Sequence, residues 1–332
     1  MIHIWAYNDI DRQQWRTLVQ RAETATWFQT EEAYLFFASL AELKAFVFGV
    51  EENGRLMGVM VGYVTVEKSS IRQFFMRRAI CVGGPLLDES ISREALCALL
   101  HIVRTELSEQ AIYIETRNLN DYSRWTDVFV ECGFVYVPHL NYHIECVQER
   151  VLQIRMHETR RRQVRNGLKN GATISEAQNE QEIHDYYHIL RRLYRKKVRT
   201  PLPSETFFLA FFRQQRGKYL LVKYEGKVIG GIMCPILDGK TIYEWYVCGQ
   251  DEQYKEQHPS VMATYAAMCY GTQHSLQRFD FMGAGNPDKD YGVRAFKAQW
   301  GGGQVAHGRF LLVCKPFLYQ LGKLGVALLR MG

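Results

Sequence analysis

The chain has 332 residues, of which 47% are hydrophobic and 23% charged, and its formal net charge is +6. This composition excludes an intrinsically disordered chain, and the length exceeds one ordinary domain and fits two. No apolar run reaches the roughly 18–20 residues that a membrane-spanning helix needs, so we expect a globular protein.

The chain start and the cysteines point to a reducing compartment. Residues 1–5 lack the basic region and following apolar stretch that mark a secretion signal. None of the 8 cysteines forms a CxxC pair, and most stand in apolar contexts. A free thiol in such a context behaves as a small buried hydrophobic group, and the pattern does not suggest a disulfide framework. We therefore predict a cytoplasmic protein.

The first half alternates helix and strand signals. Asn53-Gly54 lies between two apolar runs and is a strong hairpin signal. Ser92 is a suitable N-cap for the helix that follows it. The expected elements, in chain order, are helices at 9–22 and 30–41, a hairpin of strands 46–50 and 56–61, a helix at 92–107 and a strand at 112–115.

The second half repeats this order as a weak internal repeat. Glu225-Gly226 provides the hairpin turn, and Ser260 is the expected helix N-cap. The expected elements are helices at 180–197 and 204–214, a hairpin of strands 219–224 and 228–233, a strand at 242–247, a helix at 260–274 and a strand at 279–283. The pattern predicts a mixed α/β protein with two tandem domains, residues 1–150 and 151–332.

The excess positive charge is concentrated in one segment. Residues 155–199 contain 12 Lys and Arg against 5 Asp and Glu. Within a predicted helix, Arg161, Arg165 and Lys169 share one face, and Arg162 lies on a neighbouring face. Clustered guanidinium groups are suited to phosphate oxygens, so we favour Arg161, Arg162 and Arg165 as a substrate-binding set over a solvated helix face. For the basic residues of 191–199 we favour the solvated face over a nucleic-acid surface.

A second candidate site lies late in the chain. Asp280 stands in an otherwise apolar strand, where a carboxylate needs a partner, and Gly283 lets a ligand approach the backbone. Lys297 is a single cation in a mostly apolar helical turn, with Phe296 beside it and Tyr291 just upstream. Such a lysine can stabilise the negative charge that develops on a carbonyl oxygen, or it can be a structural partner of Asp280.

The strand at 242–247 adds candidates for holding an amine. Strand alternation places Glu244 and Tyr246 on one face, and either side chain could contact an amine substrate. The pair His184 and His188 and the pair His139 and His143 have metal-like spacing. Neither pair has a third ligand at a telling distance, so we interpret all four as surface histidines and predict no metal site.

Short motifs in a fixed order resemble the FemABX family of peptidoglycan-bridge aminoacyltransferases and related FemAB-like GNAT proteins. The matching segments are residues 27–30, 82–86, 133–134, 140–142, 160–171, 226–231, 279–283, 291–297 and 301–302. The resemblance implies two GNAT-like domains formed by duplication. It also implies transfer of an aminoacyl group from charged tRNA to an amine of a peptidoglycan precursor. Lys297 would then steady the carbonyl oxygen, and the arginines would contact a diphosphate or tRNA.

Two departures from related enzymes refine this expectation. Acyl-CoA-dependent GNAT enzymes carry an R/QxxGxG/A loop before a helix, and this chain has residues 256–260 there instead. We therefore expect no cofactor, with aminoacyl-tRNA as the co-substrate and acyl-CoA disfavoured. The chain also lacks a long charged heptad insertion, which places it with the shorter members. A function like that of FemAB-like relatives that modify polysaccharides or surface polymers also stays open.

The predicted reaction needs neither a metal nor a covalent nucleophile, because an aminoacyl ester is already activated. The amine's proton has three candidate acceptors: Asp280, a substrate carboxylate or water. Two alternatives remain, an N-acyltransferase that uses acyl-CoA or an acyl carrier protein, and a non-catalytic RNA-binding protein. The acceptor is expected to be nucleotide- or lipid-linked. Residues 316–332 are predicted to form an amphipathic helix with packing favoured over peripheral membrane contact.

Overall fold

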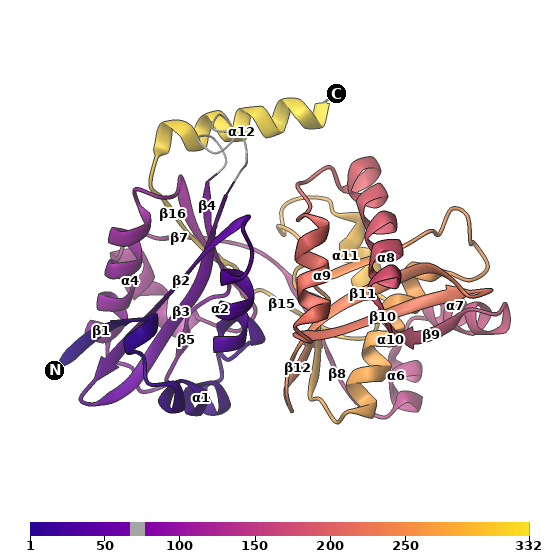
Figure 1. Cartoon of the computed structure of the whole chain (residues 1–332), viewed down its shortest axis with the longest axis horizontal. Helices are drawn as coiled ribbons and strands as arrows, with labels where there is room; N and C mark the ends of the chain where they lie inside the picture. The colour runs from indigo at the N-terminus through magenta and orange to yellow at the C-terminus, as the bar shows by residue number, and fades with distance from the viewer. Residues whose placement is uncertain (67–76, 332) are drawn as a thin grey trace. The chain divides into compact units, whose positions relative to one another are not determined.

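The computed structural model describes residues 1–66 and 77–331, which fold into two units of mixed α/β structure (Figure 1). Unit 1 comprises Met1–His139 and His307–Gly332, and unit 2 comprises Leu140–Ala306. Within each unit, helices pack on a mixed sheet, so the fold class predicted from the sequence is confirmed.

Unit 1 is built on a sheet with the strand order β1-β2-β3-β4-β6-β16-β7, and β5 pairs with β3. Its strands are β1 (Ile2–Ala6), β2 (Leu43–Glu52), β3 (Arg55–Thr65), β4 (Arg78–Gly83), β5 (Leu86–Leu87), β6 (Tyr113–Asn118), β7 (Val135–Val137) and β16 (Arg309–Val313). Its α-helices are α1 (Arg12–Arg21), α2 (Glu31–Ala38), α4 (Arg93–Leu107), α5 (Thr126–Glu131) and α12 (Pro316–Met331). Short 3-10 turns are η1 (Tyr7–Asp9), η2 (Trp27–Gln29) and η3 (Ser123–Trp125).

Unit 2 has the strand order β15-β8-β14-β12-β11-β10-β9, and β13 pairs with β11. Its strands are β8 (Asn141–Glu145), β9 (Thr173–Glu176), β10 (Gly217–Tyr224), β11 (Lys227–Leu237), β12 (Thr241–Tyr243), β13 (Tyr246–Gly249), β14 (Arg278–Asp280) and β15 (Gly303–Val305). Its helices are α6 (Glu149–Arg155), α7 (Glu158–Lys169), α8 (Glu180–Leu193), the π-helical η4 (Tyr194–Val198), α9 (Glu205–Arg213), α10 (Pro259–Gln273) and α11 (Gly292–Ala298).

Both predicted hairpins are present, and their turns explain why the sequence signal was strong. Strand β2 pairs antiparallel with β3, and β10 pairs antiparallel with β11. Asn53 and Gly54 have φ values of 52° and 80°, and Glu225 and Gly226 have φ values of 49° and 76°. Two successive residues with positive φ give the turn twist that antiparallel strands require, which favours Asn and Gly at these positions.

The last strand of each sequence repeat completes the sheet of the other repeat. Strand β8 follows the first repeat, yet it lies between β14 and β15 and pairs antiparallel with both. Strand β16 follows the second repeat, and it lies between β6 and β7 of unit 1. Without the exchanged strand, the outermost strand of each sheet would lose its partner, and backbone groups on both sides of the gap would be unpaired.

This exchange changes the domain boundary expected from the sequence. We predicted a boundary between residues 150 and 151, but residues 140–150 lie in unit 2 and residues 307–332 lie in unit 1. The periodicity of a strand does not reveal which sheet will pair with it, because any strand exposes the same row of backbone donors and acceptors. Unit 1 is therefore discontinuous in sequence.

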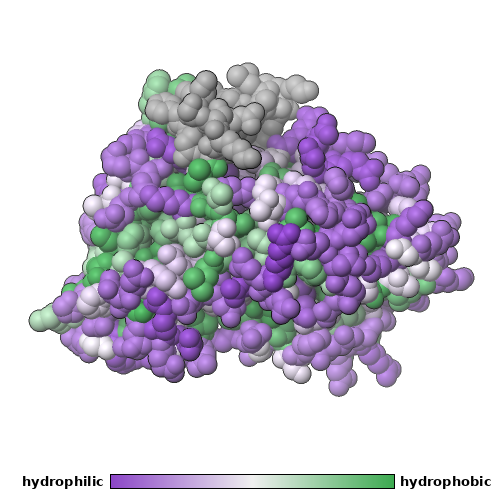
Figure 2. All heavy atoms as spheres, in the orientation of Figure 1, coloured by the Kyte–Doolittle hydropathy of each residue, from purple (hydrophilic) through white to green (hydrophobic). Residues whose placement is uncertain are grey.

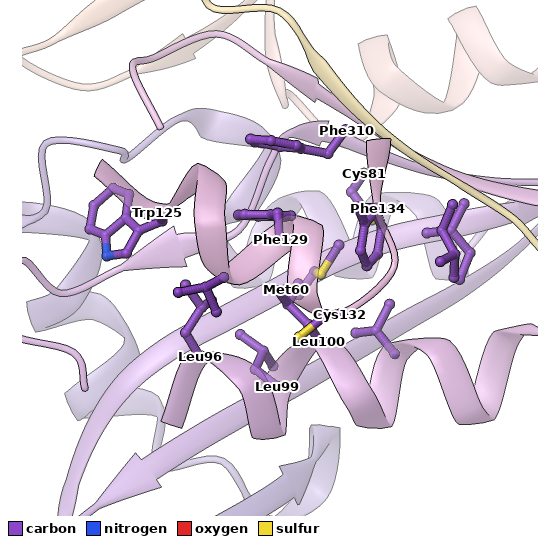
Figure 3. Packing of buried hydrophobic residues seen from close by; sticks show 14 of the residues in the cluster. Met60, Cys81, Leu96, Leu99, Leu100, Trp125, Phe129, Cys132, Phe134 and Phe310 are labelled. Atoms are coloured by element: carbon purple, nitrogen blue, oxygen red, sulfur yellow. The ribbon is translucent and has the colours of Figure 1, made fainter. Parts of the chain in front are cut away.

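The core of unit 1 is formed by residues from distant parts of the chain (Figure 3). The rings of Phe129 from α5 and Phe310 from β16 are stacked, with centroids 3.9 Å apart and an interplanar angle of 8°. Leu96, Leu99 and Leu100 of α4 are fully buried in the same cluster. No helix among residues 1–66 and 77–331 is long and apolar enough to cross a bilayer.

The exchanged strand predicts a test of stability. Phe310 is fully buried, so Phe310→Ala should cost about 3–5 kcal/mol of unfolding free energy, since it removes a large core side chain and leaves a cavity. Hydrogen exchange followed by mass spectrometry should show faster exchange in β6 and β7 of unit 1. Leu311→Ala, at a half-buried position on the other face of β16, is the control and should cost less. Faster exchange confined to unit 2 would contradict the strand assignment.

Candidate functional site in unit 2

The candidate site lies where two parallel strands of unit 2 stop pairing. Strand β12 pairs with β14 from Thr241 to Tyr243, and the Glu244 N–H then donates to the Asp280 carbonyl at 2.9 Å. The strand is interrupted at this point, and the next strand, β13, pairs with β11 alone. The continuous strand predicted at 242–247 is therefore wrong, because it is interrupted between Tyr243 and Tyr246.

Unit 1 has a comparable separation at the corresponding strands, but different side chains occupy it. Strand β4 pairs with β6 from Arg78 to Gly83, and β5 then pairs with β3 alone. At the end of β4, the Gln29 side-chain amide donates to the carbonyls of Gly83 and Gly84 at 3.2 and 2.8 Å. The Tyr122 hydroxyl also donates to the Gly83 carbonyl, at 2.8 Å. In unit 1 the carbonyl groups at this separation therefore accept hydrogen bonds from uncharged side chains.

Lys297 lies at the divergence with its ammonium group almost fully enclosed. Its side chain comes from α11 and the residue is 7% exposed. The Nζ donates to the carbonyls of Phe281 and Gly283 at 2.7 and 2.8 Å, and it lies 3.4 Å from the Glu244 carboxylate. The carboxylate closest to Lys297 is therefore Glu244 and not Asp280, the partner considered from the sequence. A lysine with three such acceptors fixes the turn that follows β14.

Glu244 is the carboxylate that sequence reasoning undervalued. It is buried, and the Thr264 hydroxyl donates to its Oε2 at 3.1 Å. Burial raises the pKa of Glu244, and the positive charge of Lys297 opposes that rise. The sequence signal was available, because a lone carboxylate in an apolar strand needs a cationic partner as much as Asp280 does. The sequence did not show that this partner would be Lys297.

Asp280 is enclosed by partners from β8, the exchanged strand. The Asn141 amide donates to its Oδ1 at 2.7 Å, the His143 Nε2 lies 3.0 Å from its Oδ2, and the Met282 N–H donates to Oδ1 at 2.6 Å. Burial favours a raised pKa of Asp280, but attraction to His143 and these hydrogen bonds outweigh burial and lower the pKa. The surface interpretation of His143 is wrong, because its side chain is only 14% exposed and packs against Asp280.

Gly283 and Phe296 have structural neighbours that explain their residue types. Gly283 has a φ of 130°, which strongly favours glycine, and its N–H donates to the Asn141 side-chain oxygen at 2.7 Å. The Phe296 ring lies 4.3 Å beneath the Arg160 guanidinium and 5.9 Å from the Trp300 ring. Gly283 thus ties the turn after β14 to β8, and Phe296 packs α11 against α7.

Three tyrosines, Tyr194, Tyr246 and Tyr291, lie near the place where β12 and β14 separate. The Tyr246 ring lies 6.3 Å from the ring of Tyr194, which sequence reasoning treated only as part of a basic helix. Tyr291 is 45% exposed; burial raises its pKa, and the nearby Glu244 carboxylate raises it further. Burial, together with Tyr291, raises the pKa of Tyr194 to about 12. A Cβ on Gly285 would approach the Tyr291 ring to 2.9 Å, so glycine is needed there for the ring to lie against the turn.

The basic helix α7 presents uncompensated guanidinium groups. Arg162 and Arg165 are exposed and Arg161 is half-buried, and in the described part of the chain none of the three has an ion pair. Arg160 differs, because its guanidinium covers Phe296 and donates to the Gln163 side chain at 2.6 Å. Burial lowers the pKa of His258, and Arg160 and Arg162 lower it further, which places these arginines near the start of α10.

The N-terminus of α10 is occupied by a carboxylate of the protein, that of Asp251. The N-cap is His258, with a φ of 47°, and not Ser260 as predicted. Pro259 has no N–H to offer, and the Ser260 N–H donates to Asp251 Oδ1 at 3.1 Å, as does the Ser260 hydroxyl to Oδ2. A carboxylate thus occupies the helix N-terminus, where the backbone dipole favours a negative group.

A cavity of about 190 Å³ lies beyond the end of β13. Arg192 and Lys196 line it from α8 and η4, and Asp251 and Glu252 line it from the segment before α10. Figure 2 shows hydrophilic residues over the α8 side of unit 2. The Lys197 Nζ lies 2.9 Å from Glu252, so part of the basic charge predicted at 191–199 is neutralised locally.

Comparisons with known proteins establish the fold. Residues 155–291 match the family model described as an acetyltransferase (GNAT) domain. The structure of FemX superimposes with a TM-score of 0.72 and 16% identity, over 96% of this chain and 99% of that chain. The likeness predicted from the motifs is therefore confirmed in three dimensions.

Two further structures support the tandem arrangement. A tandem GNAT protein from the clavulanic acid biosynthesis pathway has a TM-score of 0.57 and 10% identity, covering 95% of this chain and 99% of its own. L-PGS from Bacillus licheniformis has a TM-score of 0.56 and 11% identity, covering 95% of this chain and 96% of its own. No curated protein sequence matches the chain.

The lowered pKa of Asp280 predicts a pH-dependent contribution to stability. Because its pKa falls on folding, the contribution is complete above the unfolded value of about 3.9 and is lost as the pH falls through the folded value. Asp280→Asn should therefore cost about 1.5–3 kcal/mol near neutral pH, and the difference from the wild type should shrink in acid. Urea unfolding across this pH range measures it. Exposed Asp238→Asn is the control, and a pH-independent cost at Asp280 would contradict the prediction.

Proposed function

We propose that unit 2 is an aminoacyltransferase centre that moves an aminoacyl group from tRNA to an amine of a peptidoglycan precursor or a related cell-envelope molecule. The observation that carries the proposal is Lys297, buried where β12 and β14 stop pairing and held in place by Glu244. The GNAT fold, the FemX-like architecture and the motif resemblance to FemABX enzymes support an acyl transfer of this kind.

The proposed step forms one bond and breaks another. The acceptor amine attacks the ester carbonyl, a carbon–nitrogen bond forms, and the ester carbon–oxygen bond breaks. The released ribose hydroxyl gains a proton, and the amine loses one. Negative charge on the carbonyl oxygen is greatest between these events, and a nearby ammonium group stabilises it. The three N–H groups of Lys297 already meet the Phe281 and Gly283 carbonyls and the Glu244 carboxylate, so in this proposal the substrate oxygen takes the place of one carbonyl acceptor.

Glu244 and the backbone turn give Lys297 a fixed position. The Glu244 carboxylate keeps the ammonium group in a buried place, and the Phe281 and Gly283 carbonyls orient it. Asp280 is a weaker candidate for the proton acceptor, since its carboxylate already has partners in Asn141, His143 and Met282. We therefore assign Asp280 to positioning the turn, and we assign the amine's proton to water or to a substrate carboxylate.

The helix α10 favours a donor other than acyl-CoA. A pyrophosphate at a helix N-terminus needs free N–H groups and tolerates no competing anion. Here Pro259 lacks the N–H, and the Asp251 carboxylate accepts from Ser260. The phosphates of the substrates would instead meet α7, where Arg161, Arg162 and Arg165 have no acidic partner within the described residues.

The role of Lys297 predicts a large loss of rate. Lys297→Met should lower kcat by about 10²–10³, because one oxyanion-stabilising group is lost. Transfer of label from a mixed pool of aminoacyl-tRNAs to nucleotide- and lipid-linked peptidoglycan precursors measures it. Transfer from acetyl-CoA with none from any aminoacyl-tRNA would contradict the proposed donor.

A double variant separates catalysis from folding in that experiment. Lys297→Met alone leaves the Glu244 carboxylate buried without its cation, which typically destabilises by about 3–5 kcal/mol. Adding Glu244→Gln removes the unpaired charge and should recover thermal stability. A double variant that folds but stays inactive supports the role of Lys297 in stabilising the transition state. Recovery of full activity would show that Lys297 acts only through the fold.

The exposed arginines of α7 predict a change in salt dependence. Arg162→Gln and Arg165→Gln should each weaken binding of tRNA or of the nucleotide-linked precursor, with kcat nearly unchanged. Each should also flatten the plot of log affinity against log salt by about one unit, because one phosphate contact is lost. Lys227→Gln, at an exposed cation in the β10–β11 turn, is the matched control. Equal slopes in all variants would exclude α7 as the phosphate-binding element.

A further inference from the structure

One face of the unit 1 sheet carries a cluster of charges that the candidate site in unit 2 does not use. Arg117 on β6 and Arg309 on β16 lie directly opposite each other in an antiparallel pair. The Arg117 Nε donates to Glu115 Oε2 at 2.8 Å, and the Arg309 Nη1 donates to Glu115 Oε1, also at 2.8 Å. Like charges at directly opposite positions repel each other. A single carboxylate thus serves two arginines and neutralises the charge of only one.

A third arginine, Arg78 on β4, adds to the excess charge. Arg78 pairs in register with Tyr113 of β6. Every second residue of a strand shares a face, so Arg78 lies on the same face as Glu115 and Arg117. Burial raises the pKa of Tyr63 on β3, and Arg117 and Arg78 both act against that rise, so both guanidinium groups lie near this one hydroxyl. Across the part of the chain that the structure describes, Arg78 has no ion pair.

This excess charge is partly enclosed. The side chains of Glu115, Arg309 and Arg117 are 14%, 25% and 37% exposed. The Nε atoms of Arg78 and Arg309 are buried and have no hydrogen-bond acceptor among the described residues. Burial lowers the pKa of Arg309, Glu115 opposes this effect, and Arg117 adds to it. An enclosed guanidinium group needs acceptors for its N–H groups, and the exposed part of Arg117 leaves a route for a solute.

Helix α12 borders this face beside Tyr113, the residue in register with Arg78. The Tyr319 ring of α12 lies 5.4 Å from the Tyr113 ring. The packing expected for residues 316–332 is thus present at Tyr319, whereas Phe317 is 75% exposed and does not pack as expected. Helix α12 has no acidic residue in its sequence, so it supplies no carboxylate to neutralise Arg78.

We propose that Arg78 and Arg117 bind a terminal phosphate group, that of free phosphate or of a small phosphate ester. Arg309 keeps the Glu115 carboxylate occupied, so the charge of Arg117 is left for the ligand. Three positive charges against one negative charge leave two positive charges in the cluster. A terminal phosphate carries about −1.5 to −2 charges near neutral pH and has three acceptor oxygens. It therefore matches the cluster, whereas a carboxylate or a phosphate diester supplies only one negative charge.

Thermal unfolding of the full chain in added phosphate tests this site, and the test does not depend on the proposed aminoacyl transfer. Saturating inorganic phosphate should raise the wild-type Tm by about 2–4 °C, because a ligand that binds only the folded state stabilises it. Acetate at the same ionic strength should raise the Tm far less. Arg78→Gln should lose the phosphate-dependent rise. Without phosphate, this variant should unfold no earlier than the wild type, since it removes an uncompensated charge and breaks no ion pair of the described residues.

Two control variants keep the test specific. Arg16→Gln removes an exposed arginine of α1 and should keep the full rise, which accounts for the general stabilising effect of phosphate. A combined Arg161→Gln, Arg162→Gln and Arg165→Gln variant should also keep it, because α7 lies in unit 2. Equal rises in Arg78→Gln and Arg16→Gln, or loss of the rise in the α7 variant, would overturn the proposal. A wild-type Tm that responds alike to phosphate and acetate would also overturn it.

Phosphorus NMR titrations identify the source of the phosphate. Arg117→Gln should weaken the binding of inorganic phosphate about tenfold or more, and it leaves Glu115 paired with Arg309. Tighter binding of glycerol 3-phosphate than of inorganic phosphate would identify a small ester as the ligand, and the reverse order would identify free phosphate. Dimethyl phosphate carries one charge and should bind about tenfold more weakly than either. Equal binding of dimethyl phosphate would contradict the charge match on which the proposal rests.

Discussion

The exchange of final strands is the constraint on which the site depends. Strand β8 pairs with β14 and brings Asn141 and His143 to the Asp280 carboxylate. Asp280 in turn accepts from the Met282 N–H, and Asn141 accepts from the Gly283 N–H. These contacts shape the turn whose carbonyls Lys297 binds. A strand that follows the first repeat in sequence thus fixes the geometry of a site in the second repeat.

The two sheets have a similar strand order and differ in the side chains placed where the parallel strands separate. In unit 1, the Gln29 amide and the Tyr122 hydroxyl donate to the carbonyls at the end of β4, and β5 then pairs with β3 alone. In unit 2, pairing stops at Tyr243, and Glu244 and Lys297 occupy the place where the strands separate. A buried cation with a carboxylate partner is more stable where backbone carbonyls also accept from it, and here the turn after β14 provides them. The two units thus differ in the side chains placed at this separation, which are uncharged donors in unit 1 and an ion pair in unit 2.

Part of the site could be predicted from residue types alone. Lys297 and Asp280 are charges in apolar surroundings, which require partners, and Gly283 is a residue that permits unusual backbone angles. The partners themselves were not predictable. Glu244 comes to Lys297 because β12 ends after Tyr243, and His143 comes to Asp280 because β8 is exchanged. Neither event has a periodic signature, since both depend on which strand edges meet in space.

The sequence by itself determined the elements that depend on near neighbours. The Asn53-Gly54 turn, the Ser92 cap and the paired hairpins follow from local backbone preferences and were predicted correctly. The tertiary structure alone decided the unit boundaries, the break after Tyr243 and the partners of Lys297. The physical reason is that a strand's hydrogen-bonding edge and a buried charge are both non-specific in sequence. Each is satisfied by whatever complementary group the fold brings within reach.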